Sequence, residues 1–190
     1  MPGALPAGNF GLISDKVHLG YLPSYLRIAA DLGPAARVLE LGVYHGESLQ
    51  LWQALFPFGE VTGVDSDPKS TWPTGTLSVL SDVTSPDLPE LLNGPYDLIV
   101  DDSAHFGEVS SAAFALLWPL LASGGYYVVE DWYVGMPNAG PAGENLFPFY
   151  HGDSMVRMVQ SLIAMLDSKQ SEADEITYRY GLAVVHKRTL

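Results

Sequence analysis

The chain has 190 residues, of which 47% are hydrophobic and 16% charged, and its formal net charge is -13. This composition describes one folded domain, 1–190, and argues against nucleic-acid and anionic-membrane partners, since both need clustered Lys and Arg. The chain has no cysteine, which excludes disulfides, thiolate metal sites and cysteine nucleophiles.

The N-terminal residues do not resemble a signal peptide, because no cation precedes Lys16 and Pro2 and Pro6 interrupt the segment. The longest apolar run, 112–122, is too short to span a bilayer and contains Pro119. We therefore expect a cytoplasmic protein.

Helical and extended patterns alternate along the chain, which favours a parallel sheet covered by helices on both faces. Hydrophobic spacing predicts helices at 21–32, 47–55, 108–121 and 155–166. Apolar runs predict strands at 37–41, 61–64, 77–80, 96–100, 126–129, 175–180 and 182–186. We expect Gly124 and Gly125 to end the third helix and begin the fifth strand.

The last two expected strands form a hairpin about Gly181, which predicts one antiparallel strand. The expected fold class is therefore α/β, with a doubly wound, mostly parallel, seven-stranded Rossmann-like sheet and one antiparallel strand near the C-terminus.

Residues 132–152 contain three prolines, four glycines and several aromatic residues, which is typical of a lid or acceptor-binding loop. Equally, these aromatic residues can pack the loop down or form a subunit contact. They are Trp132, Tyr133, Phe147, Phe149 and Tyr150.

Gly42 and Gly46 lie in the turn between the first strand and the second helix. Glycines at such a turn let the backbone approach a ligand, and the helix N-terminus favours anions. A dinucleotide-binding motif would need glycine at 44 and 47, where this chain has Tyr44 and Glu47. No Gly-Lys-Ser/Thr sequence is present either, so the turn predicts a nucleoside-bearing cofactor without a pyrophosphate.

Two carboxylates end the strands that follow this turn. Asp65, 23 residues after Gly42, can accept hydrogen bonds from ribose hydroxyls, as acidic residues do in other nucleotide-binding sheets. Asp82 ends the third strand and can accept from an adenine amine. The alternative for both residues is a solvated turn at a strand end.

Carboxylates also end the fourth and fifth strands. Asp102, Glu130 and Asp131 are hard oxygen ligands without sulfur nearby, which favours Mg²⁺, Ca²⁺ or Mn²⁺ over Zn²⁺. Neighbours in a strand point to opposite faces, so Glu130 and Asp131 can share an ion only if the strand has ended there. The alternative is that one or two of them cap the next helix.

His105 lies three residues after Asp102, so a helical turn would bring both side chains to one side. Imidazole titrates near neutral pH and can take a proton from an acceptor hydroxyl, whose own pKa a bound cation would lower. Asp102 and His105 are therefore the expected catalytic residues. The alternative for His105 is an ordinary polar turn residue.

Several of these positions resemble the class I S-adenosylmethionine-dependent methyltransferases, although Tyr44 stands where that superfamily commonly has a middle glycine. They are Glu40, Gly42, Gly46, Asp65, Asp82 and Asp102. Three segments further resemble the metal-dependent sugar O-methyltransferases of macrolide biosynthesis. They are Ser14-Asp15-Lys16 with Tyr21 and Tyr25, Asp102-Ser103-Ala104-His105, and Glu130-Asp131.

The resemblance implies that S-adenosylmethionine is bound by Glu40, Gly42, Gly46, Asp65 and Asp82. It also implies Mg²⁺, or another hard divalent cation, held by Asp102, Glu130 and Asp131. The expected function is O-methylation of a sugar or another natural-product hydroxyl, with His105 as general base and a small hydroxylated molecule as acceptor. Two alternatives are methylation of a catechol-like phenol and a non-catalytic cofactor-binding accessory protein. The sequence leaves open whether the chain forms a homo-oligomer.

Overall fold

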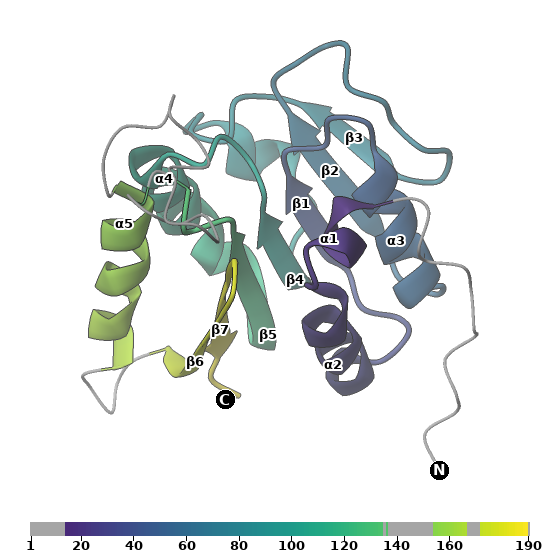
Figure 1. Ribbon diagram of the computed structural model, residues 1–190. Helices are drawn as coiled ribbons and strands as arrows, with labels where there is room; N and C mark the ends of the chain where they lie inside the picture. The colour runs from purple at the N-terminus through teal and green to yellow at the C-terminus, as the bar shows by residue number, and fades with distance from the viewer. Residues whose placement is uncertain (1–13, 135, 137–153, 167–171, 190) are drawn as a thin grey trace.

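A seven-stranded sheet runs through the molecule in the order β3-β2-β1-β4-β5-β7-β6 (Figure 1). The computed structural model describes residues 14–134, 136, 154–166 and 172–189. The strands are β1 Val38–Leu41, β2 Val61–Asp65, β3 Leu77–Leu80, β4 Tyr96–Asp101, β5 Leu121–Glu130, β6 Ala173–Arg179 and β7 Leu182–Lys187. β7 is antiparallel to both of its neighbours, and the pairs among β1 to β5 are parallel. The predicted fold class is confirmed.

Helices cover both faces of the sheet (Figure 1). The α-helices are α1 Asp15–His18, α2 Leu22–Leu32, α3 Glu47–Leu55, α4 Gly107–Leu117 and α5 Ser154–Leu162. Short 3₁₀ helices are η2 Leu88–Leu91, η3 Trp118–Leu120 and η4 Ile163–Leu166. Within the described residues, no helix is long and apolar enough to cross a membrane.

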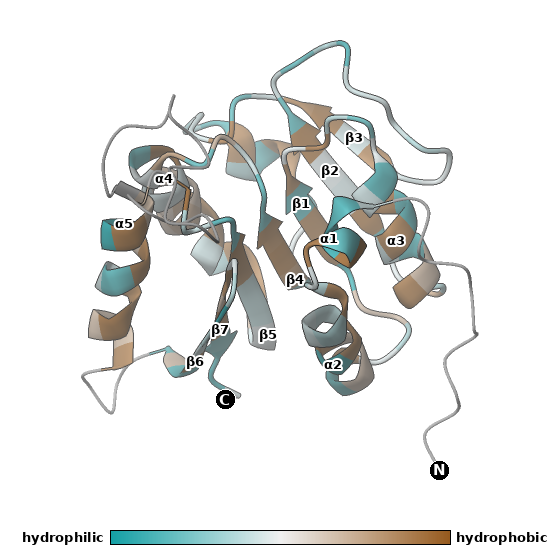
Figure 2. Cartoon of the chain, viewed as in Figure 1, coloured by the Kyte–Doolittle hydropathy of each residue, from teal (hydrophilic) through white to brown (hydrophobic). Residues whose placement is uncertain are grey.

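The strand side chains alternate between two hydrophobic cores, as expected for a pleated sheet. In β4, Ile99 packs into the core beneath α4 and α5, whereas Leu98 and Val100 pack into the core beneath α2 and α3. Figure 2 shows the inner strands as largely hydrophobic and α5 with hydrophilic residues on its outer side. Val100 of β4 and Val128 of β5 both lie on the α2–α3 face, and Asp102 and Glu130 each follow two residues later, so these two acids lie on the same side of the sheet.

The prediction that Gly124 and Gly125 separate a helix from a strand is wrong. α4 ends at Leu117, the short η3 follows, and β5 begins at Leu121 and runs through both glycines. Pro119 accounts for the early end, because proline has no N–H for the helical hydrogen bond and its ring clashes with the preceding turn.

Candidate active site

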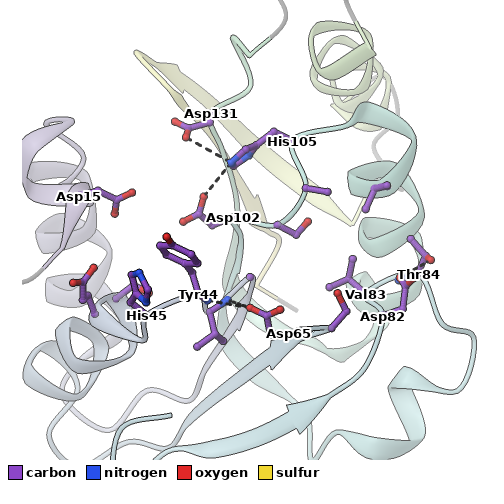
Figure 3. Close-up of a pocket in the computed structure, with 18 residues that line it drawn as sticks. Asp15, Tyr44, His45, Asp65, Asp82, Val83, Thr84, Asp102, His105 and Asp131 are labelled. Atoms are coloured by element: carbon purple, nitrogen blue, oxygen red, sulfur yellow. Dashed lines mark hydrogen bonds and ion pairs between the residues drawn. The ribbon is translucent and has the colours of Figure 1, made fainter. Parts of the chain in front are cut away.

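A cleft of about 720 Å³ opens where the parallel strands end (Figure 3). Turns that follow β1, β2, β3, β4 and β5 all contribute to its wall. The structure brings six of the predicted site residues together here: Gly42, Asp65, Asp82, Asp102, His105 and Asp131. Of the other predicted residues, Glu40 and Glu130 are buried beneath the cleft, and Gly46 is the N-cap residue that precedes α3.

Gly42 and Gly46 both have positive φ, of 86° and 72°. A Cβ on Gly42 would lie 2.3 Å from the backbone oxygen of Asp102, and one on Gly46 would lie 2.3 Å from that of Thr71. The glycines therefore let the turn after β1 pack against neighbouring backbone, which places it beside the end of β4. Their contact with a cofactor stays a prediction.

We expect Gly42→Ala to lower the free energy of unfolding by about 2–5 kcal/mol, because left-handed strain and a backbone clash add together. Gly20→Ala is the matched control: its φ is 81°, but nothing lies within 4 Å of the added Cβ. That variant should lose only about 1–2 kcal/mol. Urea unfolding measures the free energy of unfolding of both variants. Equal losses in the two would mean that the backbone clash at Gly42 contributes nothing.

Asp65 organises the turn that carries Tyr44. Its Oδ2 accepts hydrogen bonds from the backbone N–H of Val43 at 2.8 Å and of Tyr44 at 3.0 Å, and its Oδ1 accepts from Asp67 N–H at 2.8 Å. Burial raises the pKa of Asp65, but these three backbone donors outweigh it, so the pKa is lowered overall. Asp65 is thus held as a carboxylate on the wall of the cleft.

Asp82 is exposed, and its Oδ1 accepts from both the backbone N–H and the hydroxyl of Thr84, at 2.8 and 2.7 Å. Those bonds lower the pKa of Asp82. Glu40, in contrast, is fully buried, where its Oε2 accepts from Ser48 Oγ at 2.6 Å. Burial raises the pKa of Glu40 to about 7. Glu40 therefore lies beneath the turn after β1 and does not line the cleft, so its predicted contact with the cofactor stays a prediction.

Asp102, His105 and Asp131 form a compact group in which one ligand atom from each lies within 4.8 Å of the others. His105 Nε2 is 3.9 Å from Asp102 Oδ1 and 3.9 Å from Asp131 Oδ2, beyond hydrogen-bond range (Figure 3). The three side chains are between 15% and 22% exposed, so the group is reached from the cleft. Two carboxylate oxygens and an imidazole nitrogen thus face one another.

The other oxygen of each aspartate is held from the N-terminal segment. Lys16 Nζ donates to Asp102 Oδ2 at 2.7 Å, and the Tyr21 hydroxyl donates to Asp131 Oδ1. Each aspartate therefore has one oxygen fixed by a donor and presents its second oxygen to His105. Burial lowers the pKa of Lys16, but the surrounding carboxylates, Asp102 foremost, raise it well above its usual value, so the ammonium stays charged.

Glu130 lies outside the group of Asp102, His105 and Asp131. It is buried, and its two oxygens accept from the Tyr25 hydroxyl and from Lys16 Nζ, the latter at 2.9 Å. Burial raises the pKa of Glu130 well above the usual range, although Lys16 opposes the shift. Its predicted part as a metal ligand is not supported by this arrangement and stays a prediction.

Three residues other than glycine have positive φ in the described part of the chain, and all three line the cleft: Tyr44 at 49°, His105 at 53° and Asp131 at 51°. Such conformations are costly for these residues and concentrate at functional sites. They explain two geometries. Asp102 and His105 meet without the predicted helical turn, because α4 begins only at Gly107. Asp131 turns out of the pleat just after β5 ends at Glu130.

Sequence reasoning assigned no site role to Lys16, Tyr21 or Tyr25, and had them only as part of a family resemblance. No local pattern reveals them, because Lys16 lies 86 residues from Asp102 and 114 from Glu130 along the chain.

Of the predicted acceptor loop, Tyr133 stacks on Tyr180 with ring centroids 5.1 Å apart. Trp132 donates to the Arg179 carbonyl at 3.2 Å. Phe147, Phe149 and Tyr150 lie outside the described residues.

Comparison with known proteins finds a methyltransferase family and several methyltransferases. Residues 39–132 match the family described as "Methyltransferase domain". The chain is 34% identical over 170 residues to L-olivosyl-oleandolide 3-O-methyltransferase of Streptomyces antibioticus, covering 79% of this chain and 42% of that protein. It is 32% identical over 153 residues to 8-demethyl-8-(2-methoxy-alpha-L-rhamnosyl)-tetracenomycin-C 3'-O-methyltransferase of Streptomyces olivaceus, covering 73% of this chain and 38% of that protein.

Among solved structures, the fold resembles the MycE methyltransferase from the mycinamycin biosynthetic pathway in complex with Mg and SAH. The TM-score is 0.71 at 26% identity, over 89% of this chain and 50% of that one. The chain therefore spans about half or less of the length of these relatives.

Proposed function

Because the chain belongs to the class I S-adenosylmethionine-dependent methyltransferases, we propose that it methylates a sugar hydroxyl of a natural product. S-adenosylmethionine is the methyl donor in this reaction, and a divalent cation such as Mg²⁺ takes part. The facing oxygens of Asp102 and Asp131 beside His105 are the observation that carries this proposal. Two relatives are named as O-methyltransferases of an olivosyl and of a rhamnosyl compound, which supports a sugar as the acceptor.

The residues present fit a hard cation. The Asp102–His105–Asp131 group offers two carboxylate oxygens, which Mg²⁺ prefers, and this chain has no thiolate to compete for the ion. Asp102 and Asp131 would hold the cation. The MycE structure, a complex with Mg and SAH, supports the presence of such a cation but not the choice of its ligands. When bound, the cation would lower the pKa of the acceptor hydroxyl.

His105 would act as general base. Its Nε2 lies 3.9 Å from Asp102 Oδ1 and 3.9 Å from Asp131 Oδ2, the oxygens that would hold the cation and with it the acceptor hydroxyl, so the imidazole is placed to accept the proton of that hydroxyl. S-adenosylmethionine would supply the methyl group to the acceptor oxygen, its carbon–sulfur bond breaking with the bonding pair kept by sulfur and S-adenosylhomocysteine as the leaving group. Gly42, Asp65 and Asp82 would bind the nucleoside and amino-acid portions and so align the methyl group with the acceptor oxygen.

Calorimetry with S-adenosylhomocysteine and turnover on a panel of glycosides and catechols test this function. We expect measurable binding of the nucleoside, transfer to glycosides, and loss of transfer in EDTA. Faster transfer to catechols than to glycosides would show that the acceptor is a phenol and not a sugar. Binding without transfer to any panel member would favour a cofactor-binding accessory protein.

A further inference from the structure

Lys16 is a fully buried lysine whose ammonium lies among three carboxylates, those of Glu40 in β1, Glu130 in β5 and Asp102 just after β4. Its Nζ is 2.7 Å from Asp102 Oδ2, 2.9 Å from Glu130 Oε2 and 3.3 Å from Glu40 Oε1. The ammonium also lies 5.9 Å from the ring centre of Trp52. A buried ion-pair cluster of this kind is weak evidence for stability, because removing the charges from water offsets much of their attraction. Another reason for this lysine is therefore worth testing.

The fold explains why one ammonium reaches all three carboxylates. Glu40 of β1 and Glu130 of β5 lie on the α2–α3 face with Val100 of β4, and Asp102 follows Val100 two residues later on the same face. α1 carries Lys16 onto that face, where Figure 1 shows α1 beside the ends of the central strands.

The position of the ammonium has a consequence for any divalent cation. A cation that bridged Asp102 Oδ2 and Glu130 Oε2 would need the space that Lys16 Nζ occupies. Lys16 leaves Asp102 Oδ1 as the aspartate oxygen that faces His105, together with Asp131 Oδ2. Its positive charge also repels a second cation at this short range.

We propose that Lys16 is a positioning residue that competes with the divalent cation for Asp102 and Glu130 and so confines that cation to the side of Asp102 and Asp131 that faces His105. This proposal rests on the proposed function, in which the cation takes part. Lys16 thereby weakens cation binding while keeping the bound cation close to the base. Loss of the lysine should give tighter but misplaced binding.

The test is Lys16→Met, which keeps the length of the side chain and removes its charge. Mn²⁺ is the probe, titrated by calorimetry into the full chain. We expect the Kd for Mn²⁺ to fall by at least about tenfold in Lys16→Met, with S-adenosylhomocysteine affinity unchanged and kcat reduced. Lys69→Met, an exposed lysine after β2, changes the net charge equally and should bind Mn²⁺ like the unmodified chain.

Melting with and without Mn²⁺ keeps the test decisive if Lys16→Met is destabilised by its unpaired carboxylates. A cation that takes the place of the missing ammonium should raise the Tm of Lys16→Met more than that of the unmodified chain. An equal or smaller shift, or a Kd for Mn²⁺ that is unchanged or higher, would overturn the competition. A failure of the proposed function appears differently, as absent methyl transfer by the unmodified chain whatever its affinity for Mn²⁺.

Discussion

His105→Ala is expected to lower the rate of methyl transfer by about 10²–10⁴-fold while leaving the affinity for S-adenosylhomocysteine nearly unchanged. The imidazole lies at the side of the cleft formed by Asp102 and Asp131, whereas the predicted nucleoside contacts come from Asp65 and Asp82 across the cleft (Figure 3). Removing the base therefore removes a proton acceptor and leaves those contacts in place.

Single-turnover rates and calorimetry on the same preparation measure the two quantities. His18→Ala is the matched control, because His18 is exposed at the end of α1 and does not line the cleft. Its rate should stay within about twofold of the unmodified chain, as is usual for surface substitutions. Turnover by His105→Ala at that same level would remove His105 from the mechanism.

Local patterns predicted the sheet well. Apolar runs bounded by turns located all seven strands, and β3 was predicted with the bounds that the structure gives it, Leu77–Leu80. The chief error came from reading Gly124 and Gly125 as a breaker, when Pro119 had already ended the helix. Glycine is permissive in a strand as well as in a turn, so a glycine pair alone fixes neither boundary.

The candidate site was predictable to the extent that it depends on strand ends. Carboxyl ends of adjacent parallel strands meet at one edge, which is enough to bring Asp65, Asp102 and Asp131 to one cleft. What the sequence could not predict is which oxygen of Asp102 and which oxygen of Asp131 is already engaged. Lys16 and Tyr21 decide that, and both come from a segment that no strand pattern places near β4 or β5.

Removal of divalent cations is expected to lower methyl transfer by at least about 10²-fold, because the acceptor hydroxyl would then keep its ordinary high pKa in front of His105. Activity should return on adding Mg²⁺ after EDTA has been removed. Full activity in the chelated protein would remove the cation from the proposed chemistry.

Asp131→Asn identifies the cation's place in the cleft. The amide keeps an oxygen for the Tyr21 hydroxyl but removes the charge beside His105, so Mn²⁺ affinity should fall by about 10–100-fold. Asp82→Asn is the matched change at the opposite end of the cleft, where Asp82 contacts Thr84. It should weaken S-adenosylhomocysteine binding and leave Mn²⁺ binding unchanged. Calorimetry measures the affinities of Asp131→Asn and Asp82→Asn for Mn²⁺ and for S-adenosylhomocysteine. Equal losses of Mn²⁺ affinity in the two variants would mean that the cation is attracted by the summed negative charge of the cleft and not bound by Asp131.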